Sequence, residues 1–308
     1  MARFLNLAAG QLGPIARDEP RSSVVKRLIA LLDEAKSRGI ELVVFPEMAL
    51  TTFFPRWYIE DWDEVDRFFE REMPSRETRP LFEAAARLGI GFYLGYCELT
   101  EEGGKKRRYN TSILVERDGR IVGKYRKIHV PGSAVNNPAM PFQHLEQLYF
   151  SDGNLGFPVW EGFGGTMGMA ICNDRRWPET YRVMAMQGAE VVLLGYNSPA
   201  QLPDWPEHNE LRAFHHLVCM QAAAYQNGIW VAASGKAGPE EGVDMLAHSC
   251  IIAPSGQVVA LTQGRGDEVI VMDCDLETSQ AYKRFHDFDR NRKPEHYGPI
   301  LMPRPARA

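Results

Sequence analysis

The sequence predicts an α/β protein built as a four-layer α-β-β-α sandwich with an internal pseudo-two-fold duplication. Two observations predict this fold. Helical stretches end repeatedly at a glycine that leads straight into a short apolar run, and the whole pattern occurs twice along the chain. With 308 residues, 44% of them hydrophobic and 24% charged, the composition is that of an ordinary globular protein of one large domain or two.

Four helix-to-strand junctions carry the pattern. Glycine is favoured just past a helix C-terminus because it tolerates positive φ, and the apolar residues that follow each glycine are typical of buried strands. We expect helices at 22–38, 77–88, 178–187 and 209–227, and strands that open the two halves at 4–9 and 166–171. The junction glycines are Gly39, Gly89, Gly188 and Gly228.

A hairpin signal follows each pair of junctions. In the first half the chain turns at Asp118-Gly119, and in the second at Ser255-Gly256. The turn glycines and the junction glycines occur in the same order and at similar separations in both halves. Each half therefore reads β-α-β-α-β-β, and two such halves predict two sheets packed face to face with helices outside.

The domain organisation follows from these repeats. We expect one domain over residues 1–275, with halves at about 1–130 and 160–275 and loops of the active site at 128–165, a stretch rich in Pro, Gly, Asn and Gln. Residues 276–308 form a polar C-terminal tail. Its four aromatic residues predict that the tail docks on a neighbouring subunit: Tyr282, Phe285, Phe288 and Tyr297.

Charge and cysteine usage exclude several classes of protein. A net charge of −5 offers no basic stripe for nucleic acid. The apolar runs are far below the roughly 18 residues that a membrane helix needs. The five cysteines are odd in number and contain no CxxC pair, so neither a disulfide framework nor a cysteine zinc site is expected. We therefore expect a cytoplasmic protein without metal, nucleic-acid or membrane partners.

Cys172 is the leading candidate for chemistry. It follows an apolar strand and precedes Arg175, Arg176 and a helix that opens at Pro178. Positive potential from the arginines and the helix N-terminus favours thiolate over thiol. The alternative is an ordinary buried cysteine of the core, which is the commoner role for this residue type.

Two further charged residues end strands of the first half. Glu47 ends the run Val43-Val-Phe-Pro-Glu47, and Lys127 ends the hairpin strand. Functional sites of α/β sheets form outside the carboxyl ends of the strands. A thiolate that attacks a carbonyl, a carboxylate that moves protons and a cation that stabilises the oxyanion together supply covalent acyl transfer. We expect the lysine and the glutamate to be held apart so that they do not neutralise each other.

Three segments in this order resemble the nitrilase (carbon–nitrogen hydrolase) superfamily over residues 3–275. They are Phe45-Pro-Glu47, Tyr125-Arg-Lys127-Ile-His129 and Ile171-Cys-Asn-Asp-Arg-Arg-Trp-Pro-Glu179. The resemblance implies the αββα sandwich, a reaction without a cofactor, and a homodimer or homotetramer assembled through the helix after the cysteine.

The resemblance also implies the roles of individual residues. Cys172 would be the nucleophile, Glu47 the general base and then acid, and Lys127 the oxyanion stabiliser. The backbone N–H of Asn173 would complete the oxyanion hole. Glu146 would support the lysine and position water, although it could equally be a surface charge on the loop between the halves.

The last of these segments is similar to that of the family branch that acts on N-carbamoyl-D-amino acids. It implies hydrolysis to the D-amino acid, carbon dioxide and ammonia. Arg175 and Arg176 are the candidates to bind the substrate carboxylate, since a guanidinium matches a carboxylate with two parallel hydrogen bonds. One of them could instead pair with Asp174 or Glu179. His129, His144, Asn173 and Asn197 are further candidates for polar contacts with the substrate.

Other functions remain open. The chain could be another amidase, a nitrilase or a β-ureidopropionase-like enzyme of the same superfamily. It could be a non-catalytic protein that binds a small molecule, with Cys172 buried in the core. It could also use a papain-like Cys-His pair that includes His215 or His216, although these lie in an expected helix where a core or surface role is commoner.

Overall fold

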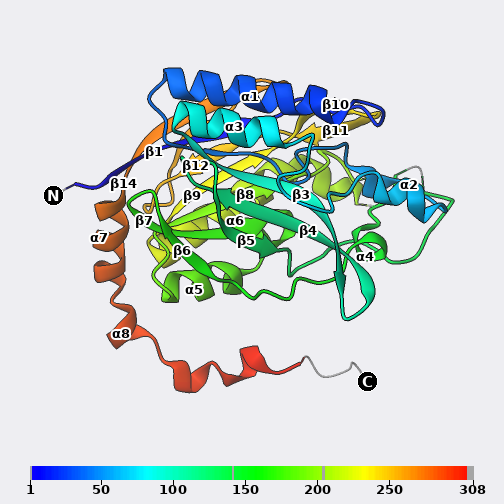
Figure 1. Ribbon diagram of the computed structural model, residues 1–308. Coiled ribbons are helices and arrows are strands. Elements are labelled where there is room, and N and C mark those ends of the chain that lie inside the picture. The colour runs from blue at the N-terminus through cyan, green and yellow to red at the C-terminus, as the bar shows by residue number, and fades with distance from the viewer. Residues whose placement is uncertain (1, 141, 203–204, 304–308) are drawn as a thin grey trace.

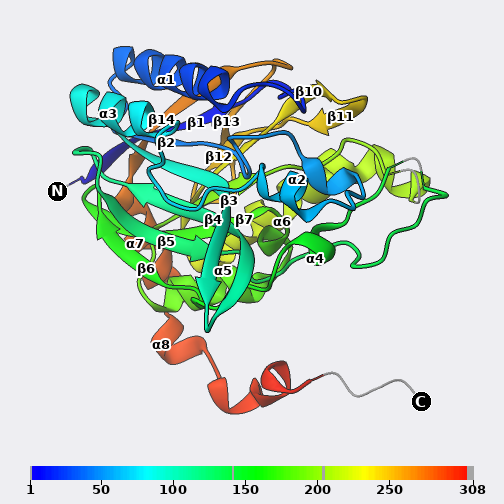
Figure 2. The same cartoon turned by 45° about the vertical axis from the view of Figure 1, so that its right-hand side comes forward.

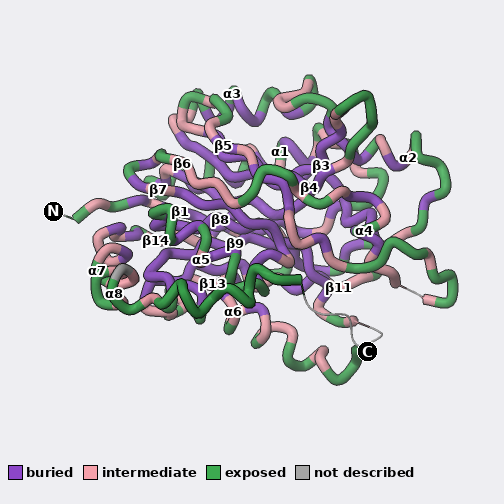
Figure 3. Tube along the Cα trace, turned by 90° about the horizontal axis from the view of Figure 1, so that it is seen from below, coloured by how far each residue is buried: buried purple, intermediate pink, exposed green. Residues whose placement is uncertain are grey.

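Two six-stranded sheets pack face to face with helices on both outer faces in the computed structural model, which describes residues 2–140, 142–202 and 205–303. The predicted α-β-β-α sandwich is thus confirmed. Helices α1 and α3 cover one sheet, and α5 and α6 cover the other (Figure 1). A tube coloured by burial shows the strands as the buried centre of the molecule (Figure 3).

The first sheet has the strand order β14-β1-β2-β3-β4-β5. Strands β1, β2 and β3 run parallel to one another, and the remaining neighbours pair antiparallel. The strands are β1 Phe4–Gln11, β2 Leu42–Val44, β3 Gly91–Glu102, β4 Lys105–Val115, β5 Ile121–Arg126 and β14 Glu268–Asp275.

The second sheet repeats this order as β6-β7-β8-β9-β12-β13. Here β7, β8 and β9 are parallel and their outer neighbours antiparallel. The strands are β6 Val159–Gly162, β7 Gly165–Ile171, β8 Val191–Tyr196, β9 Trp230–Gly235, β12 Cys250–Ile252 and β13 Val258–Leu261. A separate two-stranded sheet pairs β10 Ala237–Glu240 with β11 Val243–Leu246.

The duplication is real, but each sheet also has an edge strand that the repeat pattern did not predict. β6 follows the first half in sequence and pairs with β7 of the second sheet. β14 ends the second half and pairs with β1 of the first sheet over eight residue pairs from Phe4–Asp275 to Gln11–Glu268. Each half thus has more strands than β-α-β-α-β-β, and the two halves are interlocked.

The four crossover helices lie close to their predicted positions. They are α1 Arg21–Ser37, α3 Arg79–Leu88, α5 Pro178–Met186 and α6 Arg212–Asn227. Gly39, Gly89, Gly188 and Gly228 follow them, all at positive φ. The expected helix at 209–227 starts later, because 206–211 form a 3₁₀ helix.

Shorter helices lie in the connections. The loop at 128–165 is less irregular than expected because it holds α4 and β6. The short α-helices are α2 Trp62–Asp66, α4 Glu146–Tyr149 and α8 Phe288–Asn291, and the 3₁₀ helices span Phe54–Arg56, Cys172–Arg176, Pro206–Leu211, Pro294–His296 and Gly298–Leu301. Within the described residues, no helix is long and apolar enough to cross a membrane.

The C-terminal tail begins as a docked helix and then leaves the body of the molecule. Asp275 caps α7 Leu276–His286 by accepting a hydrogen bond from the backbone N–H of Glu277. Ser279 Oγ donates to the carbonyl of Gly228 at the end of α6. Beyond α7 the chain extends away from the sandwich as short helical turns (Figure 2).

Candidate active site

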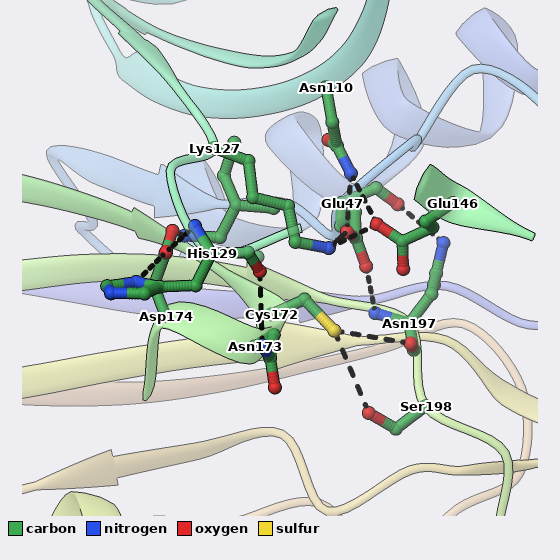
Figure 4. A network of polar contacts seen from close by, with 12 residues as sticks. Glu47, Asn110, Lys127, His129, Glu146, Cys172, Asn173, Asp174, Asn197 and Ser198 are labelled. Atoms are coloured by element: carbon green, nitrogen blue, oxygen red, sulfur yellow. Dashed lines mark hydrogen bonds and ion pairs between the residues drawn. The ribbon is translucent and has the colours of Figure 1, made fainter. Parts of the chain in front are cut away.

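Glu47, Lys127 and Cys172 come together at the carboxyl ends of three strands from both sheets (Figure 4). Glu47 lies three residues beyond β2, Lys127 directly follows β5, and Cys172 directly follows β7. All three side chains are buried. The site therefore lies between the two halves, as the positions of these residues in the sequence predict.

The Glu47 carboxylate is held by three donors. Its Oε1 accepts hydrogen bonds from Lys127 Nζ at 2.8 Å and from Asn110 Nδ2 at 2.7 Å. Its Oε2 accepts one from the backbone N–H of Asn197 at 2.7 Å. Burial raises the pKa of Glu47, the Lys127 charge partly offsets this, and the nearby charge of Glu146 adds to the rise.

Lys127 forms a direct ion pair with Glu47, so the expectation that the two are held apart is wrong. A second carboxylate, that of Glu146, also accepts from Lys127 Nζ. Burial acts to lower the pKa of Lys127, but the charges of Glu146 and Glu47 outweigh it and the pKa is raised. The charged form of the lysine is therefore favoured.

Glu146 is the first residue of α4 and is fully buried, so its interpretation as a surface charge is wrong. Its Oε1 lies 2.7 Å from His144 Nε2, and its Oε2 also accepts a 3.4 Å hydrogen bond from Asn110 Nδ2. Although burial acts to raise the pKa of Glu146, Lys127 and His144 lower it to about 2. Glu146 is thus a permanent negative charge beside the lysine.

The pKa of the Cys172 thiol is raised, contrary to the expectation from its sequence neighbours, which favour the thiolate. Burial raises its pKa, and the charge of Glu47 raises it further, against the opposing charges of Lys127 and Arg175. The thiol donates to the carbonyl of Asn197 at 3.4 Å. A 3₁₀ turn separates Cys172 from α5, which weakens the influence of the helix N-terminus.

The backbone at Cys172 is strained. Its φ is +47°, in the left-handed region that non-glycine residues rarely adopt, at a cost of about 1–3 kcal/mol. This conformation turns the chain sharply from the end of β7 into the 3₁₀ helix and points the thiol toward Asn197 and Ser198 (Figure 4). Such a turn presents a nucleophile at the edge of a sheet.

The two arginines after the cysteine differ in their surroundings. Arg175 is 1% exposed and donates to the Cys172 carbonyl at 2.7 Å and to Ser198 Oγ at 2.9 Å, with its guanidinium also 3.6 Å from the thiol sulfur. Arg176 is exposed. Neither arginine pairs with Asp174 or Glu179 in the described part of the chain, so the alternative of an internal ion pair is wrong.

Asp174 instead organises the polar residues around the cysteine. Its carboxylate accepts hydrogen bonds from Tyr125 OH at 2.8 Å and from the backbone N–H of Ile171 at 2.9 Å, and lies 2.7 Å from His129 Nδ1. The His129 ring also stacks on Trp177 at 5.0 Å. Asn173 Nδ2 donates to the His129 carbonyl. His129 and Asn173 are thus fixed next to the nucleophile.

The Asn197 side chain contacts the catalytic segment itself. Its Nδ2 donates to the Glu47 carbonyl at 2.8 Å, while its Oδ1 is buried without a protein partner among the described residues. His144 is half-buried beside Glu146. The papain-like alternative finds no support, because the His216 ring bonds the His248 carbonyl and packs on Tyr196 rather than meeting the thiol.

Three polar residues of the site escaped the sequence reasoning. Asn110, in the middle of β4, bonds both carboxylates; Ser198 contacts Cys172 and Arg175; and Arg212 begins α6. Burial and the charges of Arg176 and Arg175 lower the pKa of Arg212 to about 10. Only the strand-end position of Ser198, next to Asn197, could have signalled its role. No set of three His, Cys, Asp or Glu side chains in the described ranges is arranged to hold a metal ion.

The chain resembles curated enzymes along most of its length. It is 32% identical over 281 residues to a citrullinase of Francisella tularensis, which covers 89% of this chain and 91% of that protein. It is 26% identical over 283 residues to an N-carbamoylputrescine amidase of Oryza sativa, covering 88% and 87% of the two chains.

Solved structures and a family model agree with these relatives. A carbon-nitrogen hydrolase of Helicobacter pylori G27 superposes with a TM-score of 0.81 at 22% sequence identity, covering 97% of this chain and 99% of that one, which shows the shared fold. The model of the carbon-nitrogen hydrolase family matches residues 6–284. The chain therefore belongs to the carbon–nitrogen hydrolase family, the nitrilase superfamily, whose members act as hydrolases on carbon–nitrogen bonds.

Proposed function

We propose that this protein hydrolyses N-carbamoyl amino acids, with a preference for the D series, to the amino acid, carbon dioxide and ammonia. One observation carries the proposal: three arginines without a carboxylate partner among the described residues cluster beside the nucleophile. They are Arg175, Arg176 and Arg212. The scissile group follows from the relatives, since N-carbamoylputrescine and citrulline both carry a ureido carbonyl.

The reaction begins with the thiol of Cys172. Glu47, ionised and held by Lys127, takes the thiol proton as the sulfur forms a bond to the ureido carbonyl carbon. The oxyanion is stabilised by the Lys127 ammonium and the Asn173 backbone N–H. One carbon–nitrogen bond then breaks, and protonated Glu47 gives its proton to the departing nitrogen.

Water completes the cycle. Glu47, ionised again, takes a proton from a water that attacks the thioester carbonyl and restores the free thiol. Hydrolysis of the acyl-enzyme releases a carbamic acid, whose remaining carbon–nitrogen bond breaks as carbon dioxide is lost. Overall, one water is consumed and the products are the amino acid, carbon dioxide and ammonia. Glu146 stays ionised beside Lys127 and keeps the lysine charged through both steps. Its negative charge remains in place while Glu47 alternates between its ionised and protonated forms.

The substrate carboxylate is assigned to the exposed edge of the arginine cluster. Two donors of Arg175 are engaged by the Cys172 carbonyl and by Ser198, so this residue acts as a buried positive charge and a support for the turn. The charge of Arg175 lowers the pKa of Arg176, and both charges act on Arg212. An anion bound between Arg176 and Arg212 would relieve this repulsion.

The D preference rests on the similarity of the segment Cys172–Glu179 to that of the family branch acting on N-carbamoyl-D-amino acids. His129, His144 and Asn197 are proposed to line the polar side of the substrate pocket. The main competing substrates belong to the same family: carbamoyl amines, ω-carbamoyl acids such as β-ureidopropionate, and simple amides.

Ammonia release from a substrate panel tests the proposal. The panel contains D and L pairs of N-carbamoyl amino acids, their carboxamides, N-carbamoylputrescine, N-carbamoyl-β-alanine and citrulline. For Arg176→Ala and Arg212→Ala we expect kcat/KM to fall about 10- to 100-fold on free acids, since a bond to a charged group contributes about 1.5–3 kcal/mol. We expect little change on the matched carboxamides.

Two controls separate the parts of the proposal. Cys172→Ala should abolish turnover of every substrate, and activity close to wild type would exclude the covalent mechanism. If N-carbamoylputrescine is turned over faster than any free acid, or if both arginine variants lose acids and carboxamides equally, the assignment of the carboxylate site is wrong.

We also propose a homodimer or homotetramer of single-domain subunits spanning 1–275, located in the cytoplasm. Exposed apolar side chains on α5 and α6 support the assembly: Val183, Met186, Phe214, Val218 and Tyr225. The protruding tail carries exposed Ile300, Leu301 and Met302, which suit a neighbouring subunit. All five cysteines are free, which fits a reducing compartment.

A further inference from the structure

A second cluster of fully buried charges lies beyond the residues assigned to the chemistry. Arg56, Lys236 and Glu240 are each at most 4% exposed. Glu240 Oε1 accepts from Arg56 Nη2 at 2.9 Å, and its Oε2 accepts from Lys236 Nζ at 2.9 Å. Buried ion pairs contribute little net stability compared with apolar residues of the same size, so their geometry calls for another explanation.

The cluster forms hydrogen bonds with the backbone of the chain segment that follows Glu47. Glu240 Oε1 also accepts the backbone N–H of Phe53 at 2.8 Å, Lys236 Nζ donates to the carbonyl of Thr51, and Arg56 Nε donates to the carbonyl of Phe53 at 2.9 Å. This segment has little regular structure to satisfy its own polar groups. Glu240 in β10 and Lys236, which directly follows β9, supply partners from outside the segment, and Arg56, in the 3₁₀ helix Phe54–Arg56, supplies one from within it.

The same segment also contacts the chain next to Glu146, the second carboxylate of the proposed site. The backbone N–H of Leu145, just before α4, donates to the carbonyl of Pro55 at 2.8 Å. The Phe53 ring meets the His144 ring edge-on at 5.4 Å, and His144 contacts Glu146. A line of direct contacts therefore runs from Glu240 through Phe53 to His144 and Glu146.

The charges of the two clusters are complementary. Arg56, Lys236 and Glu240 together carry one excess positive charge, whereas Glu47, Glu146 and Lys127 carry one excess negative charge. Cys97 lies near both, since Glu47 and Lys236 each act on its thiol. The formal charges of the two clusters thus sum to zero.

We propose that Glu240 is a positioning residue for catalysis: by fixing the 51–56 segment it sets the places of Glu47 and Glu146 on either side of Lys127. The inference rests on the roles given to Glu47 and Glu146 in the proposed function. Glu240 touches neither substrate nor reacting atoms, and acts only through Phe53 and the backbone around it.

Glu240→Gln tests this inference because glutamine keeps the size of the side chain but removes the charge that holds both cations. We expect kcat to fall about 10- to 100-fold, since small misplacements of catalytic groups have effects of this size, while KM changes less than about twofold. The substrate is whichever amide or carbamoyl compound the wild-type enzyme turns over. Failure of the N-carbamoyl proposal therefore leaves this test intact.

Glu190→Gln is the matched control. Glu190 is also a buried glutamate that accepts from an arginine and a backbone N–H, those of Arg3 at 2.6 Å and Thr166 at 3.2 Å. It lies at the opposite ends of the strands, directly before β8. We expect it to lower the melting temperature and leave kcat unchanged. If Glu240→Gln also loses only thermal stability, Glu240 is merely structural and the inference is wrong.

A second variant keeps the test decisive if Glu240→Gln fails to fold. Phe53→Leu retains the backbone N–H that Glu240 accepts but removes the ring edge from His144. We expect it to fold, to lower kcat and to leave KM unchanged. If Phe53→Leu has the kcat of the wild type, the contact between Phe53 and His144 does not link Glu240 to Glu146 in catalysis, and the inference is wrong.

Discussion

The state of Cys172 decides how the nucleophile is activated. In many thiol enzymes a nearby cation lowers the thiol pKa so that a thiolate is present before substrate arrives. Here burial and the charge of Glu47 raise the pKa instead. In the proposed mechanism, the proton therefore passes to Glu47 as the sulfur attacks, so that activity requires ionised Glu47.

The pH dependence follows from the direction of the Glu47 shift. Burial raises its pKa above the ordinary carboxyl value, and the protonated form cannot accept the thiol proton. Activity should therefore be present above this raised pKa and be lost as pH falls through it. We expect the acid limb of kcat/KM to lie above the unperturbed glutamate value of about 4.3.

Asn110→Leu should move that limb to higher pH. The substitution removes the 2.7 Å hydrogen bond that favours ionised Glu47, so the pKa of Glu47 should rise by about one unit, the equivalent of about 1.4 kcal/mol. The measurement is kcat/KM against pH. Asn227→Leu is the control, since this buried amide at the end of α6 donates to the Ala223 carbonyl and, within the described ranges, has no other side-chain hydrogen bond. A limb that stays in place in Asn110→Leu would refute this role.

At the level of residues, the charged and nucleophilic groups that end strands in recognisable segments were predictable from the sequence. Glu47, Lys127 and Cys172 were placed correctly at one edge because carboxyl ends of neighbouring strands meet there. Asn110 could not be found, since it is one polar residue within a long strand and meets Glu47 63 positions away. The raised pKa of Cys172 was likewise hidden, because burial depends on the second sheet.

Among the secondary-structure elements, two strands from different sheets enclose the backbone of Glu47. Gly95 lies in β3 of the first sheet and Gly195 in β8 of the second. A Cβ at Gly95 would lie 2.6 Å from Glu47 Cα, and one at Gly195 would lie 2.6 Å from the Glu47 backbone nitrogen. Both strands therefore need glycine, and the sheet-to-sheet distance at this point sets the position of the base.

Gly195→Ala should impair catalysis more than folding. The added methyl group meets backbone atoms, which cannot rotate away, so Glu47 must shift relative to Lys127 and Cys172. We expect a loss of about 1–3 kcal/mol of stability and a fall in kcat of about 100-fold. Differential scanning calorimetry and steady-state kinetics measure the two effects.

Gly168→Ala is the matched control for this substitution. Gly168 is also a glycine in a central strand of the second sheet, but its Cβ would meet the flexible Met184 side chain, with Sδ at 2.5 Å. We expect a similar loss of stability with kcat close to wild type. Equal kinetic effects of the two variants would mean that the close approach at Gly195 has no special role.

The elements that local chemistry determines were predictable, and those determined by pairing were not. The glycines after α1, α3, α5 and α6 marked the ends of these helices because each of them adopts positive φ. The positions of β6 and β14 at the edges of the two sheets had no local signal. An edge strand forms only when it pairs with another strand. β6 is a short, partly exposed segment, and its local sequence does not indicate that it pairs with β7.

At the scale of the whole molecule, the two outer faces of the sandwich differ. The exposed part of α1 and α3 is mostly polar, whereas α5 and α6 pack together and present exposed Val183, Met186, Phe214 and Val218. Exposed apolar side chains on neighbouring helices are the basis on which we propose this face as the subunit interface. The face lies directly behind the Cys172 turn, since that turn leads into α5.

Val183→Asp combined with Phe214→Asp should separate the subunits of the proposed assembly. A carboxylate buried against an apolar partner surface lacks a counter-charge, which costs several kcal/mol per site and exceeds what a homodimer contact of this kind can offset. Sedimentation equilibrium should show an oligomer for the wild type and a monomer for the double variant. Ala30→Asp, on the exposed face of α1, is the control and should leave the mass unchanged. A wild-type monomer, or a double variant of unchanged mass, would rule out α5 and α6 as the interface.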